Sequence, residues 1–182
     1  MTIIVEKTLS FAVFILMLLN IDSIYKFHKE TSGNYLQDNT TRQNTMEMIM
    51  ESFENKKDYK AITEFYGIHI PIKKFHDMVK KIIPCVESYH IIMNNETNKA
   101  SGYVLPYYSR KNIYINNNHW PMLDIYSKSH LIIHECTHLT LDTDDYAYDY
   151  QDKLFSLRGS HALHNADTIT SIICALSYYN KH

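Results

Sequence analysis

Two histidines and a glutamate in a short apolar stretch have the types and the spacing that metal chemistry requires. In the sequence LIIHECTHL, His134 and His138 stand four residues apart and Glu135 directly follows the first histidine. On an α-helix, positions four apart lie on one face, so both imidazoles can bind one metal ion. Glu135 projects about 100° further around the helix and can take a proton from an attacking water. This pattern indicates metal-assisted hydrolysis of a peptide bond.

The apolar residues around the histidines favour a helix with two different faces. Ile132, Cys136 and Leu139 fall on the side opposite the histidines. One face can therefore pack in the core while the other holds metal. An ordinary amphipathic helix with two surface histidines is the alternative interpretation.

Two histidines do not complete a zinc site, and the third ligand distinguishes the classes of zinc peptidase. No glutamate follows Glu135 in the chain, which excludes the thermolysin-like class. The metzincin pattern needs a glycine and a histidine where this chain has Leu141 and Asp144. Four aspartates follow the second histidine and are the candidates that the residues alone leave open: Asp142, Asp144, Asp145 and Asp149.

Residues 142–149, DTDDYAYD, resemble the GTxDxxYG motif of the aspzincins, the deuterolysin and peptidyl-Lys metalloendopeptidase family. Three residues match its informative positions: Thr143, Asp145 and Tyr148. Asp142 and Asp149 replace its two glycines, and aspartate tolerates left-handed backbone better than most residues. Residues 101–120 and the later LHNADTI, residues 163–169, also resemble family elements in the family's order.

The resemblance implies a role for each matching residue. One zinc ion per chain would have three ligands, assisted by a general base and by a hydrogen-bond donor to the developing oxyanion. Two further residues would line the pocket for the residue after the cut. The implied zinc ligands are His134, His138 and Asp145. Glu135 is the implied general base and Tyr148 the implied hydrogen-bond donor to the oxyanion. Asp167 and Thr170 are the implied pocket residues. The lysine-cutting branch has an acidic residue where this chain has Thr170, so we expect cleavage that is not restricted to lysine.

The N-terminal region has the composition of an export signal. Residues 9–19 form an uncharged apolar run of 11 residues after Lys7, a length that suits a signal peptide better than a membrane span. An uncleaved anchor and a buried helix are the alternatives. We predict a signal peptide at 1–23, a polar linker or short pro-segment at 24–45 and a zinc metallopeptidase domain at 46–182, in a secreted, extracellular protein.

The composition is that of one globular domain. The chain has 182 residues, 45% of them hydrophobic, and a net charge of −2, which argues against a general nucleic-acid binder. We expect a monomer that acts on a protein or peptide and meets a membrane only through an uncleaved N-terminal segment. The three cysteines can close at most one pair and are interpreted as small buried hydrophobic residues: Cys85, Cys136 and Cys174.

The periodicity predicts a mostly helical α+β fold with a small strand ribbon before a central HExxH helix, and the resemblance implies that this fold is a zincin-like metallopeptidase domain. The expected helices cover about 45–67, 71–83, 127–140 and 160–179, and the expected strands 101–108 and 112–116. His161 and His164 are interpreted as residues of the surface or of the surroundings of the metal site.

These observations predict a secreted zinc-dependent endopeptidase. The alternative is a catalytically silent aspzincin-like domain that binds a partner protein. The presence of Glu135 argues against that alternative, because a domain without activity does not need the base.

Overall fold

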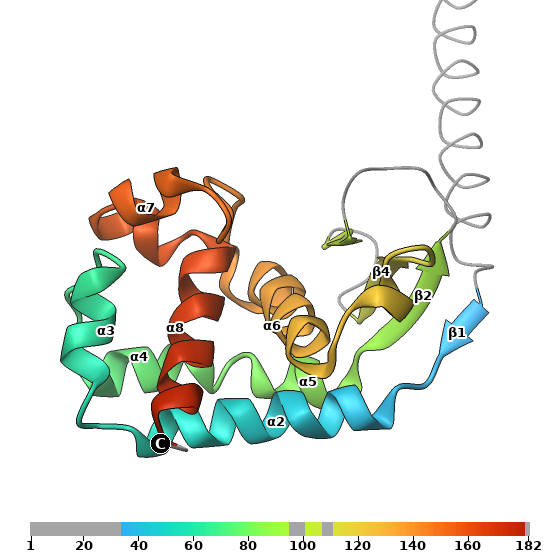
Figure 1. The fold of residues 1–182 in the computed structure, drawn as a ribbon, viewed down its shortest axis with the longest axis horizontal. Helices are drawn as coiled ribbons and strands as arrows, with labels where there is room; N and C mark the ends of the chain where they lie inside the picture. Colours follow the sequence, from blue (N-terminus) through green and yellow to red (C-terminus); the bar gives the residue numbers. More distant parts are fainter. Residues whose placement is uncertain (1–33, 95–100, 107–110, 181–182) are drawn as a thin grey trace, which may run out of the picture. The chain divides into compact units, whose positions relative to one another are not determined.

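The computed structural model describes residues 34–94, 101–106 and 111–180 (Figure 1). The predicted signal peptide at 1–23 and the expected linker up to residue 33 lie outside these ranges. Residues from Tyr35 onward form one compact unit. None of the helices in the described ranges is long and apolar enough to cross a bilayer.

The fold is a mixed α+β arrangement dominated by helices, as the sequence predicts. The helices are α2 (Asn39–Glu54), α3 (Tyr59–Phe65), α4 (Ile72–Val79), α5 (Ile83–Ser88), α6 (Ile125–Leu141), α7 (Gly159–Leu163) and α8 (Ala166–Asn180). The strands are β1 (Asn34–Leu36), β2 (His90–Asn94), β3 (Gly102–Val104) and β4 (Asn112–Asn116). Two short 3₁₀ turns cover Trp120–Met122 and Asp152–Ser156.

The sheet is larger than the predicted two-stranded ribbon. Its strand order is β1-β2-β4-β3, with β4 parallel to β2 and antiparallel to β3. β2 was not predicted from the sequence, because its HIIMN stretch has three apolar residues in a row and therefore lacks the alternation of a strand. All five residues of β4 are buried, so Tyr114 is enclosed like Ile113 and Ile115.

β3 lies directly against α6. A Cβ atom added to Gly102 would come within 3.2 Å of the Leu131 side chain on α6. Glycine therefore permits this close approach between the strand and the helix. The edge of the sheet and the histidine-bearing helix consequently share one cleft.

α6 is buried on the face that the sequence predicts. It contacts α2, α5, α8 and β3. Ile132, Ile133 and Cys136 are fully buried. The helix begins where Asp124 Oδ1 accepts the Ser127 N–H at 2.7 Å, which satisfies one of the free amides of its first turn. These contacts fix the direction in which the opposite face points.

Two of the three cysteines, which the sequence analysis interprets as small buried hydrophobic residues, are buried and also form the one pair that the sequence allows. Cys85 on α5 and Cys136 on α6 form a disulfide with a Cα–Cα distance of 5.8 Å, and Cys174 is free. The two paired residues are 51 positions apart in the sequence, so their proximity depends on the packing of α5 against α6. Sequence spacing alone gives no sign of such a contact.

Residues 39–45, expected as linker, belong to α2. Asp38 Oδ1 accepts the Thr41 N–H at 2.9 Å and caps the helix. Thr41 and Thr45 are buried, and the Thr45 hydroxyl donates to the Thr41 carbonyl at 2.6 Å. Polar residues thus pack inside without the apolar period that marks a helix in a sequence.

Candidate metal centre

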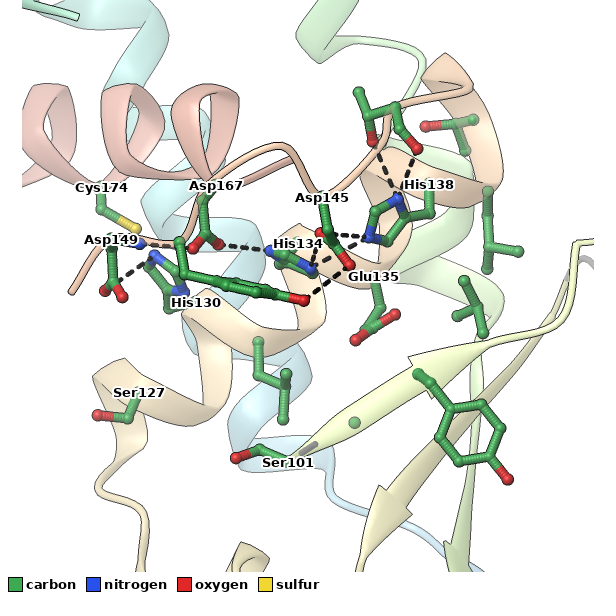
Figure 2. Close-up of a pocket in the computed structure, with 18 of the residues that line it drawn as sticks. Ser101, Ser127, His130, His134, Glu135, His138, Asp145, Asp149, Asp167 and Cys174 are labelled. Atoms are coloured by element: carbon green, nitrogen blue, oxygen red, sulfur yellow. Dashed lines mark hydrogen bonds and ion pairs between the residues drawn. The ribbon is translucent and has the colours of Figure 1, made fainter. Parts of the chain in front are cut away.

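α6 places His134 and His138 side by side at the wall of the cleft. Their Nε2 atoms are 3.1 Å apart. Figure 2 shows both rings on the same side of α6, with Asp145 beside them. The helical spacing of four residues accounts for this arrangement, because it aligns the two side chains one above the other.

The chain reverses sharply after α6 to bring a carboxylate back to the histidines. Asp142 adopts the left-handed conformation, with φ 56°, at the position where the family motif has a glycine. The Thr137 and Thr143 hydroxyls lie 2.8 Å apart and join the turn to the helix. The Asp144 N–H then donates to the His164 carbonyl at 2.7 Å, which holds the returning segment in place.

Of the four candidate aspartates, the structure brings Asp145 to the histidines. Its Oδ1 lies 3.2 Å from Nε2 of His134 and 3.2 Å from Nε2 of His138. The Asp144 carboxylate instead accepts a hydrogen bond from the Tyr146 hydroxyl at 2.9 Å. Asp149 points toward His130, at 3.9 Å from its Nε2.

The hydrogen bonds of the two rings show which nitrogen atoms are free to bind metal. His134 Nδ1 lies 2.5 Å from Asp167 Oδ1, and His138 Nδ1 lies 2.7 Å from the Thr143 carbonyl oxygen. A carboxylate and a carbonyl can only accept, so each Nδ1 must carry the proton. In the neutral rings both Nε2 atoms therefore present lone pairs, and these face a carboxylate oxygen. Three acceptors converge on one point, which is the arrangement that a cation stabilises.

The separations of these donor atoms fit zinc. Zinc bound tetrahedrally at about 2.1 Å from each ligand places neighbouring ligand atoms about 3.4 Å apart. The observed separations are 3.1 Å and 3.2 Å. His134, His138 and Asp145 are also the one group of three potential ligands within 4.8 Å of one another in the described ranges. The donor set of two imidazoles and one carboxylate is ordinary for zinc, with a fourth position left for water or substrate.

The profile of the aspzincin family, described as lysine-specific metallo-endopeptidase, matches residues 54–171. The match covers more than half of the chain and includes α6 and the whole metal-site loop. The chain belongs to the aspzincin family. The family implies a metalloendopeptidase and a zinc ion. No curated protein gives a significant match to the chain.

In this aspzincin, Asp167 lines the cleft beside the metal site and contacts His134. The residue is 4% exposed. One carboxylate oxygen contacts His134 Nδ1, and the other accepts the Asp149 N–H at 2.7 Å. Carboxylates in this position fix the orientation of a metal-binding histidine and increase its basicity. These contacts connect Asp167 to His134, and its implied role in substrate binding stays a prediction.

Thr170 also differs from the expected pocket residue. It is completely buried, and its hydroxyl donates to the Ala166 carbonyl at 2.9 Å. Position 170 lies one turn of α8 beyond Asp167, but the side chain points into the helix packing and does not line the cleft. Its implied role in the substrate pocket stays a prediction.

The carboxylates control the protonation of the histidines. Burial opposes a charge on His134, but hydrogen bonds to Asp145 and Asp167 outweigh it and raise its pKa to about 10. The pKa of His138 is also raised, because its contacts with Asp145 and Thr143 outweigh burial. Although burial acts in the other direction, the two histidines hold the pKa of Asp145 well below its usual range. In the absence of a cation, protons are therefore retained at the place where metal would bind.

Glu135 and Tyr148 complete the polar wall beside the three ligands. Glu135 is 3% exposed, and burial raises its pKa to about 7 against the opposing effect of the histidines. The Tyr148 hydroxyl donates to Asp145 Oδ2 at 3.2 Å. Burial and the Asp145 carboxylate raise the pKa of Tyr148 to about 12, so the phenol stays protonated.

A cleft of about 1670 Å³ surrounds the site. Its walls come from β3, α6, the 142–150 loop and α8. Several polar residues that line it were not singled out from the sequence, His130 and Cys174 among them. His130 stands four residues before His134, and this spacing is the signal that places it on the same face of the helix. As expected, His161 and His164 are exposed surface residues, and neither lines this cleft.

Proposed function

We propose that this aspzincin is a secreted zinc-dependent endopeptidase that hydrolyses peptide bonds with a metal-activated water. The observation that carries the proposal is the convergence of two Nε2 lone pairs and one Asp145 oxygen, with both Nδ1 atoms held by acceptors. His134, His138 and Asp145 would hold the ion. A bound zinc ion supplies Lewis acidity, which lowers the pKa of a water and polarises a carbonyl.

Glu135 is placed to move the proton. It lines the cleft next to His134 and His138, and its raised pKa of about 7 suits exchange near neutral pH. A nearby dication would lower that pKa and favour the carboxylate form. The carboxylate takes a proton from the attacking water and returns it to the nitrogen of the departing peptide.

Tyr148 is placed to donate a hydrogen bond to the substrate oxygen as negative charge develops there. Its hydroxyl is already held at the site by Asp145, and its pKa of about 12 keeps the proton available. A donor aimed in advance at developing charge lowers the barrier more than one that must reorganise.

The open edge of β3 is suited to hold the substrate main chain. The Asn116 N–H donates to the Ser101 carbonyl at 3.0 Å, so Ser101 and Tyr103 direct their main-chain groups toward β4. Gly102 and Val104 alternate with them and face the other edge. No described strand lies beyond β3, and both residues line the cleft. An extended peptide can therefore pair with β3 while it crosses the metal site.

The burial of Asp167 and Thr170 supports cleavage that is not restricted to lysine. Asp167 is committed to His134 and the Asp149 N–H, and Thr170 offers no carboxylate. A lysine ammonium would therefore not find the expected pair of acidic residues at these positions. Cleavage of a peptide library only before lysine would contradict this part of the proposal.

Export is supported by the apolar run at 9–19 and by the disulfide. Disulfides persist mainly in oxidising compartments, and Cys85–Cys136 is one in this protein. Recovery of the protein outside the cell with Met1 still at its N-terminus would contradict removal of a signal peptide near residue 23.

The direct test of the activity is metal-dependent proteolysis. The zinc-loaded protein should cleave an unfolded protein substrate, lose that activity to a chelator and regain it with added zinc. Full activity after complete removal of the metal would refute the proposed function.

A further inference from the structure

Tyr148 and Tyr150 present two parallel aromatic rings in the loop that carries the third metal ligand. Their ring centroids are 5.6 Å apart, and their planes differ by 2°. Aromatic rings attract each other in offset arrangements with centroids about 4.5–7 Å apart. The ring of Tyr148 also lies 6.3 Å from that of His134, with planes 19° apart. Tyr148 therefore contacts a metal-binding residue and a second tyrosine that the proposed mechanism does not use.

Hydrogen bonds hold the turn that carries both tyrosines. The Gln151 N–H donates to the Tyr148 carbonyl at 2.9 Å, which closes a turn over residues 148–151. The Gln151 side-chain oxygen accepts the Tyr148 N–H at 3.3 Å. The Asp149 N–H, between the two tyrosines in the sequence, donates to Asp167 on α8 at 2.7 Å. The main chain beneath the two rings is thus fixed to α8, and both side chains leave it from a held position.

Burial in the core does not account for Tyr150. Its side chain is 78% exposed, and it lines the cleft. A ring that keeps most of its surface in water gains little from the hydrophobic effect. Within the described ranges, its one aromatic contact is with Tyr148. That contact is therefore the feature of Tyr150 that needs an explanation.

The hydrogen bond that orients the Tyr148 ring in this structure is one that it must give up during the reaction. The Tyr148 hydroxyl donates to Asp145 Oδ2 at 3.2 Å. A phenol has a single O–H, so it cannot donate fully to Asp145 and to the substrate oxygen at the same time. Once the proton is aimed at the substrate, Asp145 no longer fixes the ring. The contact with Tyr150 involves the ring and not the hydroxyl, so it persists through this change.

We propose that Tyr150 is a positioning residue for the hydroxyl of Tyr148. Its ring restricts the side-chain rotation of Tyr148 and keeps the phenol aimed at the substrate oxygen while negative charge develops there. A donor that is held in advance lowers the barrier because it does not have to reorganise. The inference rests on the proposed function, since only a Tyr148 that donates to the developing oxyanion needs such positioning.

Steady-state kinetics of the zinc-loaded protein test this role. Tyr150→Ala removes the ring, whereas Tyr150→Phe keeps the ring and removes only the hydroxyl. Loss of the interaction within an aromatic pair corresponds to about a 2- to 12-fold change in rate. We expect kcat to fall by about this factor in Tyr150→Ala with KM unchanged, and both constants to stay at wild-type values in Tyr150→Phe. The matched control is Tyr179→Ala, which removes an exposed tyrosine outside the cleft and should change neither constant.

A double-mutant cycle shows whether Tyr150 acts through Tyr148. Tyr148→Phe removes the hydroxyl and retains the ring, and we expect it to lower kcat by at least about 100-fold, the scale for loss of an oxyanion donor. In that background Tyr150→Ala should cause no further loss, because no hydroxyl is left to position.

A phosphinic peptide provides a second readout that does not require hydrolysis. Its anionic oxygen stands where the oxyanion of the substrate would form, so its affinity depends on the aim of the Tyr148 hydroxyl. The affinity should fall by about 2- to 12-fold in Tyr150→Ala and stay unchanged in Tyr150→Phe.

Unchanged kcat in Tyr150→Ala would overturn the proposal. An equal loss in the wild-type and Tyr148→Phe backgrounds would overturn it as well, because Tyr150 would then act independently of the hydroxyl. A rise in KM alone would assign Tyr150 to substrate binding and not to positioning. If the zinc-loaded wild-type protein hydrolyses no peptide, the proposed function fails, and the phosphinic peptide decides on Tyr150. Equal affinity for the wild-type protein and Tyr150→Ala, or binding to neither, would then overturn the positioning role.

Discussion

Replacement of Asp167 by asparagine separates two roles that this residue can have. The structure places it behind His134, with Oδ1 at 2.5 Å from Nδ1 and Oδ2 accepting the Asp149 N–H at 2.7 Å. Asparagine has nearly the same shape, so the packing of α8 is retained. Its single carbonyl oxygen can accept from only one of the two N–H groups, and its amide then faces the other donor.

The expected effect is on metal affinity. Loss of a carboxylate that orients a metal-binding histidine weakens metal binding by about 10- to 100-fold. This corresponds to about 1.4–2.8 kcal/mol of binding free energy. We predict that Asp167→Asn weakens zinc binding within this range, measured by competition with a chromophoric chelator at fixed pH. Asp144→Asn is the matched control, because the Asp144 carboxylate is exposed and bonded only to Tyr146 among the described residues.

The opposite pattern would refute the assignment of Asp167 to the metal site. If Asp167→Asn kept the zinc affinity of the wild-type protein but changed the preferred residue after the cut, Asp167 would act on substrate. The pocket implied by the family resemblance would then be correct, and the contact with His134 would be incidental.

Three further predictions follow from the same geometry. Asp145→Ala should abolish zinc binding, because it removes the carboxylate at 3.2 Å from both Nε2 atoms, whereas Asp144→Ala should retain it; the reverse result in a metal analysis would assign the ligand to Asp144. Zinc affinity should fall as pH decreases, by about tenfold per pH unit for each proton that zinc must displace. The reason is that the pKa of His134 is raised to about 10 and the pKa of His138 is raised too. A zinc dissociation constant that is the same at pH 6 and pH 8 would contradict this. Asp142→Val should lower the free energy of unfolding by about 1–2 kcal/mol, measured by thermal or denaturant unfolding, because φ is 56° at this position. Asp142→Gly should cause no such loss. Equal losses in the two variants would show that the left-handed backbone is not the cause.

The sequence predicts the histidine-bearing helix α6 better than the elements that surround it. α6 has an apolar face and two histidines four residues apart, so helical geometry alone places both rings together. Asp145 could be chosen among four aspartates only through the resemblance to a motif, because the turn at Asp142 depends on a backbone conformation that spacing does not reveal.

The features that the sequence did not predict depend on contacts between distant segments. The Cys85–Cys136 disulfide and the contact of Asp167 with His134 each join elements far apart in the chain. The start of α2 was missed because its buried residues at the beginning are the threonines Thr41 and Thr45, which do not show the apolar period of a helix. His130 was overlooked although its spacing places it on the face of His134, because a further histidine there also fits an ordinary amphipathic helix.

The central claim is that Glu135 transfers the proton in a zinc-dependent cleavage of peptide bonds. Its most direct test compares the hydrolysis rates of the wild-type protein and Glu135→Gln at equal, measured zinc content. Glutamine keeps the size and the buried position of the side chain but cannot accept a proton. We expect one zinc ion at the metal site in both proteins and a rate that is lower by at least about 100-fold in Glu135→Gln. Equal rates at equal zinc content would contradict the account.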